Sequence, residues 1–116
     1  VKDICKAFEA LAFSNNTDGM VFNAASEYEV SIGETVKLIG EIMNSNIHIL
    51  SDKKRIRPKD SEVFRLYGDS KLLQSYTNWK PEFGGLDGFK KGLLKTIDWF
   101  TNSENLIHYS ANNYFL

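Results

Sequence analysis

The sequence predicts a single small domain of the mixed α/β class. Stretches with the apolar repeat of amphipathic helices alternate along the chain with short apolar runs typical of strands. The helical stretches are residues 3–13, 31–44, 70–77 and 86–100, and the strand-like runs are 20–24, 46–50 and 63–67. The chain has 116 residues, of which 42% are hydrophobic and 25% are charged, and these values suit one globular domain. We therefore expect a domain over residues 1–102 and a tail over 103–116.

In the first fifty residues we expect two helices, each followed by a strand. Asp3 is a candidate cap for the first helix, whose apolar stripe is made of Ile4, Ala7, Phe8 and Leu11. Turn-forming residues then separate this helix from a buried strand at 20–24. Ser31 and Glu34 have the S-x-x-E spacing of a capping box, which predicts the start of the second helix. The second strand follows at 46–50.

A cationic loop follows, and it is the most distinctive stretch of the sequence. Five of the seven residues from 53 to 59 are Lys or Arg, and Pro58 stands directly after Arg57. Proline pushes the residue before it into extended backbone, so we expect Arg57 on a rigid support. A guanidinium group binds phosphate oxygens bidentately, which makes this loop a candidate anion site. A solvated basic loop without a ligand is the alternative.

After the loop we expect a short strand, a short helix and a long helix. Residues 63–67 alternate like a strand, and Asp69 is a candidate N-cap for the helix at 70–77. The stretch 86–100 has a strong amphipathic pattern, with Leu86, Phe89, Leu93, Ile97 and Phe100 on one face. The aromatic residues of the tail either pack onto this domain or face a partner segment.

Composition limits the class of function. The net charge is −1, so any affinity for anions has to be local, in the cationic loop. Cys5 is the one cysteine of the chain, which excludes an internal disulfide and favours a reducing, cytoplasmic compartment. The sequence has no signal-peptide pattern and no apolar run long enough to cross a membrane. It opens directly into a helical pattern, and we expect it to be part of a longer protein.

Residue spacing predicts no catalytic residue, no cofactor loop and no metal site. Tyr67 and Lys71 match the Y-x-x-x-K pair of many short-chain dehydrogenases, but Gly68 interrupts the helix that this pair requires. The glycines at 84, 85 and 88 follow no buried strand, so they do not form a dinucleotide-binding loop. The cysteine and the two histidines lack metal-ligand spacing: Cys5, His48 and His108.

Several short motifs stand along the chain in a specific order, although each is weak alone. The first three are V-x-D at 1–3, V-F-N-A-A-S at 21–26 and V-S-I at 30–32. The others are R-P at 57–58, S-E-V at 61–63, Asp69, W-K-P at 79–81, L-D-G-F at 86–89 and T-I-D-W-F at 96–100. In this order the motifs resemble the C-terminal, substrate-binding part of the extended short-chain dehydrogenase/reductases, the NAD-dependent nucleotide-sugar epimerases and dehydratases. The resemblance runs from Val1 to about Phe100.

This resemblance implies a fold, a function and site residues. The chain would be a small α/β substrate-binding subdomain from a Rossmann-type enzyme. Residues 57–63 look most like the 4,6-dehydratases of UDP-N-acetylglucosamine and GDP-mannose. By resemblance, Arg57 would contact the substrate diphosphate, Glu62 would lie near the ribose or the nucleotide end, and Asn23 would lie beside the sugar-nucleotide pocket. Asp69 would be a structural helix cap.

The resemblance also implies a cofactor and partners. NAD would be held mainly by an N-terminal Rossmann domain, which also carries the glycine-rich loop and the catalytic Tyr/Lys pair. This chain lacks both, so we expect it to bind substrate without catalysing the reaction alone. The implied partners are a nucleotide-sugar and that N-terminal domain, in a parent enzyme that could be a homodimer, with no membrane.

Two other functions stay open at this point. A free-standing interaction module could use the cationic loop to bind acidic protein or nucleic acid, although no aromatic residue interleaves with the cations to stack on bases. A regulatory or assembly module could keep a substrate-like fold without the activity. The sequence does not distinguish dehydratase from epimerase, and it does not identify the nucleotide or the sugar.

Overall fold

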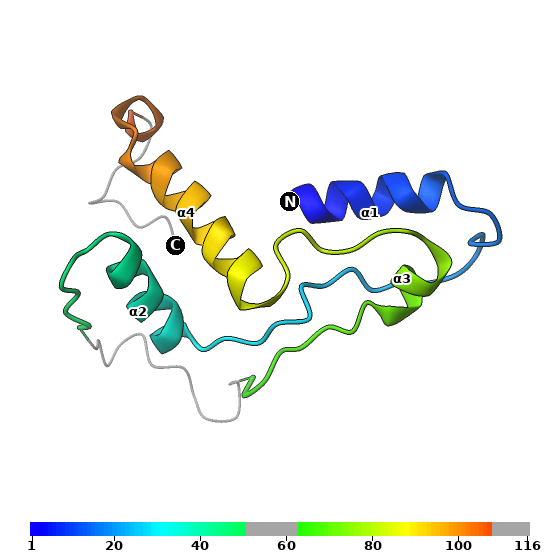
Figure 1. The fold of residues 1–116 in the computed structure, drawn as a ribbon, viewed down its shortest axis with the longest axis horizontal. Helices are drawn as coiled ribbons and strands as arrows, with labels where there is room; N and C mark the ends of the chain where they lie inside the picture. The colour runs from blue at the N-terminus through cyan, green and yellow to red at the C-terminus, as the bar shows by residue number, and fades with distance from the viewer. Residues whose placement is uncertain (51–62, 108–116) are drawn as a thin grey trace.

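The computed structural model describes residues 1–50 and 63–107, and there the chain consists of helices joined by extended segments (Figure 1). The α-helices are α1 (Lys2–Ala12), α2 (Ile32–Ile42), α3 (Lys71–Tyr76) and α4 (Gly85–Thr101), and a 3₁₀ helix, η3 (Ser103–Leu106), follows. The four predicted helices are present. The described residues contain no β-strand, so the predicted α/β class, and with it the Rossmann-type subdomain, is wrong.

The three predicted strands, at 20–24, 46–50 and 63–67, have no backbone ladder. A strand needs a neighbouring backbone to pair with, and an alternating sequence does not supply one. In the described ranges, one hydrogen bond joins the backbones of segments far apart in sequence, from the N–H of Gly85, the first residue of α4, to Ser26 O at 3.3 Å. Alternation therefore indicates the direction of side chains here, but not sheet formation.

The core lies between α1, α3 and the segment that leads into α4. Ala7, Leu73 and Trp79 are buried, and the side chains packed against them are Ala10, Leu11, Phe22 and Ala24. The Trp79 indole also donates a hydrogen bond to the Asp3 carbonyl oxygen at 2.9 Å. The W-K-P motif thus contributes an aromatic side chain to the core as well as ending a helical unit.

Asp3 does not cap α1, because it lies inside the first turn of the helix. Its carboxylate instead accepts hydrogen bonds from the backbone N–H groups of Glu82 and Phe83, at 3.0 and 2.9 Å. Glu82 in turn bridges Lys6 of α1 and Lys91 of α4, at 2.8 and 2.6 Å. Together these contacts fix the turn before α4 against α1.

The capping box of α2 is confirmed. Ser31 Oγ accepts from the Glu34 N–H at 3.1 Å, and Glu34 Oε2 accepts from the Ser31 N–H at 2.9 Å. The start of α3 lies one residue later than predicted, since its N-cap is Ser70. Asp69 still supports this helix, because its Oδ1 accepts from the Lys71 N–H at 2.9 Å.

The first residues of the predicted tail are tied to the end of α4. Asn102 Oδ1 accepts from the Glu104 N–H, and the Asn105 side chain donates to the Trp99 carbonyl, both at 3.0 Å.

Across residues 1–50 and 63–107, no helix has the length and apolar character needed to span a membrane.

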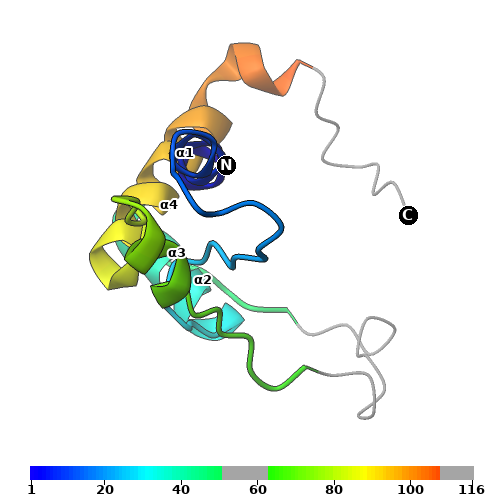
Figure 2. The ribbon, with the colours of Figure 1, turned by 90° about the vertical axis from the view of Figure 1, so that its right-hand side faces the viewer.

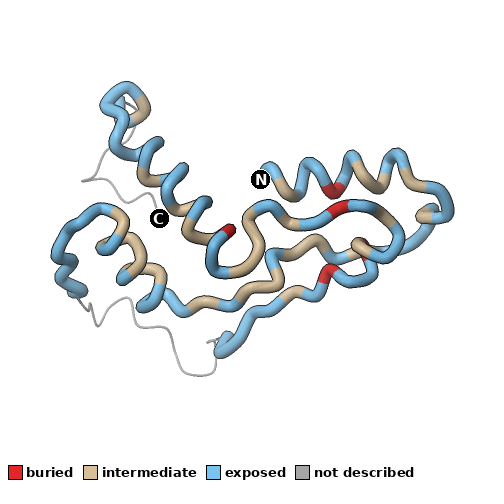
Figure 3. Tube along the Cα trace, viewed as in Figure 1, coloured by how far each residue is buried: buried red, intermediate tan, exposed pale blue. Residues whose placement is uncertain are grey.

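The described elements form a single curved layer (Figure 2). Few positions along this layer are buried (Figure 3). The Cα radius of gyration is 18.0 Å, whereas a compact domain of this length has about 13 Å. Domains usually close their core by packing two layers together. The described part of the chain therefore leaves much of its apolar surface uncovered.

Candidate functional site

Of the three predicted substrate-binding residues, the structure describes Asn23, whereas Arg57 and Glu62 lie outside the described residues. Asn23 is exposed in the segment between α1 and α2, while its neighbours Phe22 and Ala24 pack against the core. Successive side chains on an extended chain point to opposite sides. Asn23 is therefore directed toward solvent, where a ligand can reach it.

Two extended segments, residues 20–31 and 63–70, run side by side (Figure 1). They approach closely at Ala25 and Gly68, where a Cβ built on the glycine would lie 2.5 Å from the Ala25 Cβ. A side chain at position 68 would push the segments apart. Gly68 thus brings the segment that follows the cationic loop against the segment that carries Asn23.

Glu27 connects the two segments through one carboxylate oxygen. Its Oε1 accepts hydrogen bonds from Ser70 Oγ at 2.7 Å, from Ser70 N–H at 3.1 Å and from Gln74 Nε2 at 3.0 Å. These bonds, first of all the one from the Ser70 hydroxyl, lower the pKa of Glu27. Glu27 also has φ +52°, in the left-handed region that side chains other than glycine seldom adopt. The three hydrogen bonds compensate for this unfavourable conformation.

Glu29 and Arg65 form a second connection between the same segments. Arg65 Nε donates to Oε1 at 2.9 Å, and Nη2 donates to Oε2 at 2.8 Å. The side-chain hydrogen bonds lower the pKa of Glu29 and raise the pKa of Arg65. The Arg65 side chain is 79% exposed, so water and salt screen the pair. The pair orients the guanidinium group without burying it.

A groove of about 580 Å³ lies beside this ion pair, between residues 29–34 and 63–66. Its charged lining consists of two carboxylates, Glu29 and Glu34, and one guanidinium, Arg65. Such a lining does not favour a diphosphate by itself, because the carboxylates repel it. The predicted cationic loop, residues 53–59, lies outside the described residues, and the first residue of this groove after it is Val63.

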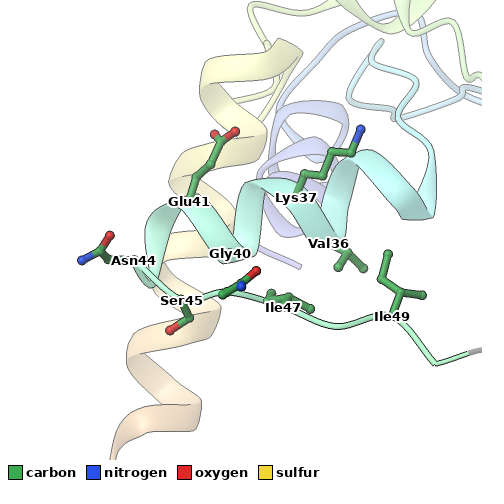
Figure 4. Close-up of a pocket in the computed structure, with 9 residues that line it drawn as sticks. Val36, Lys37, Gly40, Glu41, Asn44, Ser45, Ile47 and Ile49 are labelled. Carbon is green, nitrogen blue, oxygen red and sulfur yellow. The ribbon is translucent and has the colours of Figure 1, made fainter.

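A second groove, of about 680 Å³, lies between α2 and the segment that follows it (Figure 4). Val36, Ile47 and Ile49 point toward one another between the helix and the segment, whereas Lys37 and Glu41 extend from the opposite side of α2. The apolar part of the groove is therefore made by these three side chains. Polar side chains, among them Lys37, Glu41 and Ser45, complete the lining of the groove.

The described residues show no arrangement suited to a metal ion, since no three His, Cys, Asp or Glu side chains are grouped for one. Tyr67 lies on extended chain before α3, and Lys71 is the first residue of that helix. Gly88 packs against its own chain, because a Cβ there would lie 2.4 Å from the Phe83 carbonyl carbon. This glycine allows α4 to pack closely against the turn before it.

Sequence reasoning missed three residues that organise this region, namely Glu27, Glu29 and Arg65. Each acts through a partner more than thirty residues away in the chain. The pairing of such residues depends on how the chain folds. The sequence indicated only that Arg65 is the charged residue within the alternating run 63–67.

Comparison with known proteins identifies no relative. No protein-family model matches the chain, and neither a curated protein nor a solved structure matches it significantly.

Proposed function

We propose that this chain supplies the nucleotide-sugar-binding portion of an NAD-dependent sugar-nucleotide 4,6-dehydratase or epimerase, and that its cationic loop binds the substrate diphosphate. The observation that carries this proposal is Arg57-Pro58 followed by S-E-V at 61–63, within the ordered series of motifs described above. Proline restricts the backbone of the residue before it, so on this proposal the guanidinium group of Arg57 is held on a rigid support.

The distribution of charge supports the role of the loop. The chain as a whole carries −1, although five cations stand within residues 53–59. The remainder of the chain is therefore negative, and the described groove at Glu29 and Arg65 has more carboxylate than guanidinium. A diphosphate suits the loop, whereas the hydroxyl groups of a ribose or sugar suit the mixed lining of the groove, which offers both donors and acceptors.

The arrangement of the described segments is compatible with one continuous ligand site. Asn23 is exposed on the segment that Gly68 brings against residues 63–70. Val63, the first described residue after Glu62, already lines the groove. On this proposal Arg57 binds the diphosphate, Glu62 accepts hydrogen bonds from the ribose, and Asn23 lies beside the sugar.

The oxidation itself would belong to an N-terminal Rossmann domain of the parent enzyme. NAD bound there would supply the hydride chemistry at the sugar carbon. The residues of this chain bind and orient the substrate, and the chain alone is inactive. The proposed compartment is the cytoplasm, in agreement with a single cysteine that has no disulfide partner.

Titration with UDP-N-acetylglucosamine or GDP-mannose, followed by amide chemical shifts, tests this proposal. We expect saturable shifts at Asn23 and at residues 53–67, and weaker binding of the corresponding nucleoside monophosphate, which lacks the second phosphate and the sugar. A free-standing anion-binding module would instead bind single-stranded oligonucleotides with a steep salt dependence. The absence of shifts with every nucleotide-sugar would contradict the proposal.

A further inference from the structure

Asp18 and Gly19 form the middle of an exposed turn that follows α1. The Met20 N–H donates a hydrogen bond to the Thr17 carbonyl at 3.1 Å and closes the turn. Gly19 has φ +74°, and a Cβ built on it would have no atom within 4 Å. A positive φ at the third residue of a turn is typical of glycine. Gly19 is therefore exposed to solvent, with open space on the side where other residues carry a side chain.

An aspartate that precedes a glycine reacts with its own backbone when the geometry allows. The glycine nitrogen attacks the side-chain carboxyl carbon, a C–N bond forms, and one carboxyl oxygen leaves as water with the amide proton and the proton of the acid. The product is a five-membered succinimide ring. Water then opens this ring at either carbonyl, which restores aspartate or produces isoaspartate, whose backbone runs through the side-chain carbon. Glycine favours the attack because no Cβ hinders it.

The attack needs a backbone nitrogen that no hydrogen bond holds in place. Within the described residues, the Gly19 N–H donates none, because the turn is closed by the N–H of the next residue, Met20. A segment with few such bonds opens at a small cost in free energy. The reactive conformation of Asp18 and Gly19 is therefore reached without disturbing a helix or the core.

The second Asp-Gly pair of the sequence, Asp87 and Gly88, is held in a different way. It lies in α4, where the buried Gly88 donates its N–H to the Gly84 carbonyl at 3.2 Å. The pair of Asp69 with the small Ser70 is held too, since the Ser70 N–H donates to a carboxylate oxygen at 3.1 Å. Both nitrogens are engaged, so the fold protects these pairs and leaves Asp18 reactive.

We propose that Asp18 is a modification site at which isoaspartate forms through a succinimide with Gly19. The freed α-carboxylate of isoaspartate is the group that a protein-isoaspartate methyltransferase methylates, with S-adenosylmethionine as the methyl donor. Each conversion adds one methylene group to the backbone between α1 and Phe22, both of which contribute to the core. The site lies outside the groove at Glu29 and Arg65, so it does not depend on the proposed function.

Ageing of the full chain at neutral pH and physiological temperature tests this proposal. Trypsin then places Asp18 in the peptide 7–37 and Asp87 in the peptide 72–90, because it does not cut before Pro81. Purified isoaspartate methyltransferase with radiolabelled S-adenosylmethionine measures isoaspartate in each peptide. We expect the label in 7–37 to grow with time and to exceed that in 72–90 at least about tenfold, because reaction within a helix requires local opening. Equal labels, or no label in 7–37, would overturn the proposal.

Two further measurements separate the residue and the fold from other causes. Asp18→Glu keeps the charge but would need a six-membered ring, so it should abolish the label in 7–37, whereas the matched variant Asp87→Glu should leave that label unchanged. Wild-type chain aged in urea should label both peptides alike, because unfolding frees both glycine nitrogens. A label in 7–37 that survives Asp18→Glu, or a difference between the peptides that persists in urea, would contradict the assignment to this turn.

Discussion

The guanidinium group of Arg65 binds the carboxylate of Glu29 in a bidentate ion pair, with Nη2 and Oε2 2.8 Å apart. The two residues are 36 positions apart in sequence. Their pair joins the segment that carries Asn23 to the segment that follows the cationic loop. It lies at the edge of the groove that we assign to the uncharged part of the ligand.

Arg65→Ala should lower the thermal midpoint of unfolding slightly at low salt and have no effect at high salt. Exposed ion pairs contribute little, and salt screens what they contribute. Scanning calorimetry at two ionic strengths measures this difference. Lys71→Ala is the control, because Lys71 makes a longer and more exposed pair with Asp69 at 3.7 Å and should show no effect at either salt concentration. An Arg65→Ala effect that persists in high salt would contradict the screened pair.

Glu82 should make the protein less stable in acid. Hydrogen bonds from Lys6 and Lys91 lower the pKa of Glu82 from 4.5 to about 2. Between these values the folded state binds fewer protons than the unfolded state, so the stabilisation is complete above about pH 4.5 and is lost as the pH falls toward 2. Thermal unfolding followed from pH 7 downward measures the loss.

Glu82→Gln should flatten this acid profile, since the amide does not titrate. The matched variant Glu104→Gln changes an exposed carboxylate in η3 and should keep the wild-type profile. Identical slopes for Glu82→Gln and the wild type would show that Glu82 does not couple α1 to α4.

Leu73→Ala should destabilise the fold by about 2–5 kcal/mol, because it removes a fully buried side chain from a small core. Its neighbour in α3, Leu72, is 47% exposed, and Leu72→Ala should cost no more than about 0.5 kcal/mol. Urea titration of both variants measures the free energies of unfolding. Equal losses would mean that the core is not centred on Leu73.

Two glycines of α4 should respond to alanine in opposite directions. A Cβ at Gly88 would lie 2.4 Å from the Phe83 carbonyl carbon, so Gly88→Ala should destabilise the protein by about 1–3 kcal/mol. A Cβ at Gly92 would meet the Phe83 ring at 3.6 Å, an ordinary contact. Gly92→Ala should therefore stabilise the helix by about 0.5–1 kcal/mol. Circular dichroism during urea unfolding separates the two outcomes, and a stabilising Gly88→Ala would refute the packing at Phe83.

The helices could be predicted from the sequence because their determinants are local. The capping box of Ser31 and Glu34 and the apolar repeats of residues 3–13 and 86–100 act within a few turns. The strands could not be predicted in this way. Residues 20–24 are a mostly apolar run and residues 63–67 alternate, but a ladder depends on which backbone lies alongside, and in the described residues side chains join the two segments.

The same distinction between local determinants and long-range contacts applies to the candidate site. Arg57 lies outside the described residues and stays a prediction, which depends on the effect of proline on the residue directly before it. The contacts of Glu27 with Ser70 and of Glu29 with Arg65 join residues that only the fold brings together. Asp3 has the residue type of a helix cap, yet its carboxylate binds the turn at Glu82, a contact that the local sequence does not indicate.

Arg57→Ala tests the role of the cationic loop most directly. We predict that the variant binds UDP-N-acetylglucosamine or GDP-mannose more weakly than the wild-type protein by about 1.5–3 kcal/mol, the range for hydrogen bonds to charged groups. Arg55→Ala, which removes a cation from the same loop without a following proline, should have a smaller effect. Isothermal titration of the three proteins decides the question: a loss confined to Arg57→Ala supports a diphosphate site, and an affinity unchanged by Arg57→Ala contradicts it.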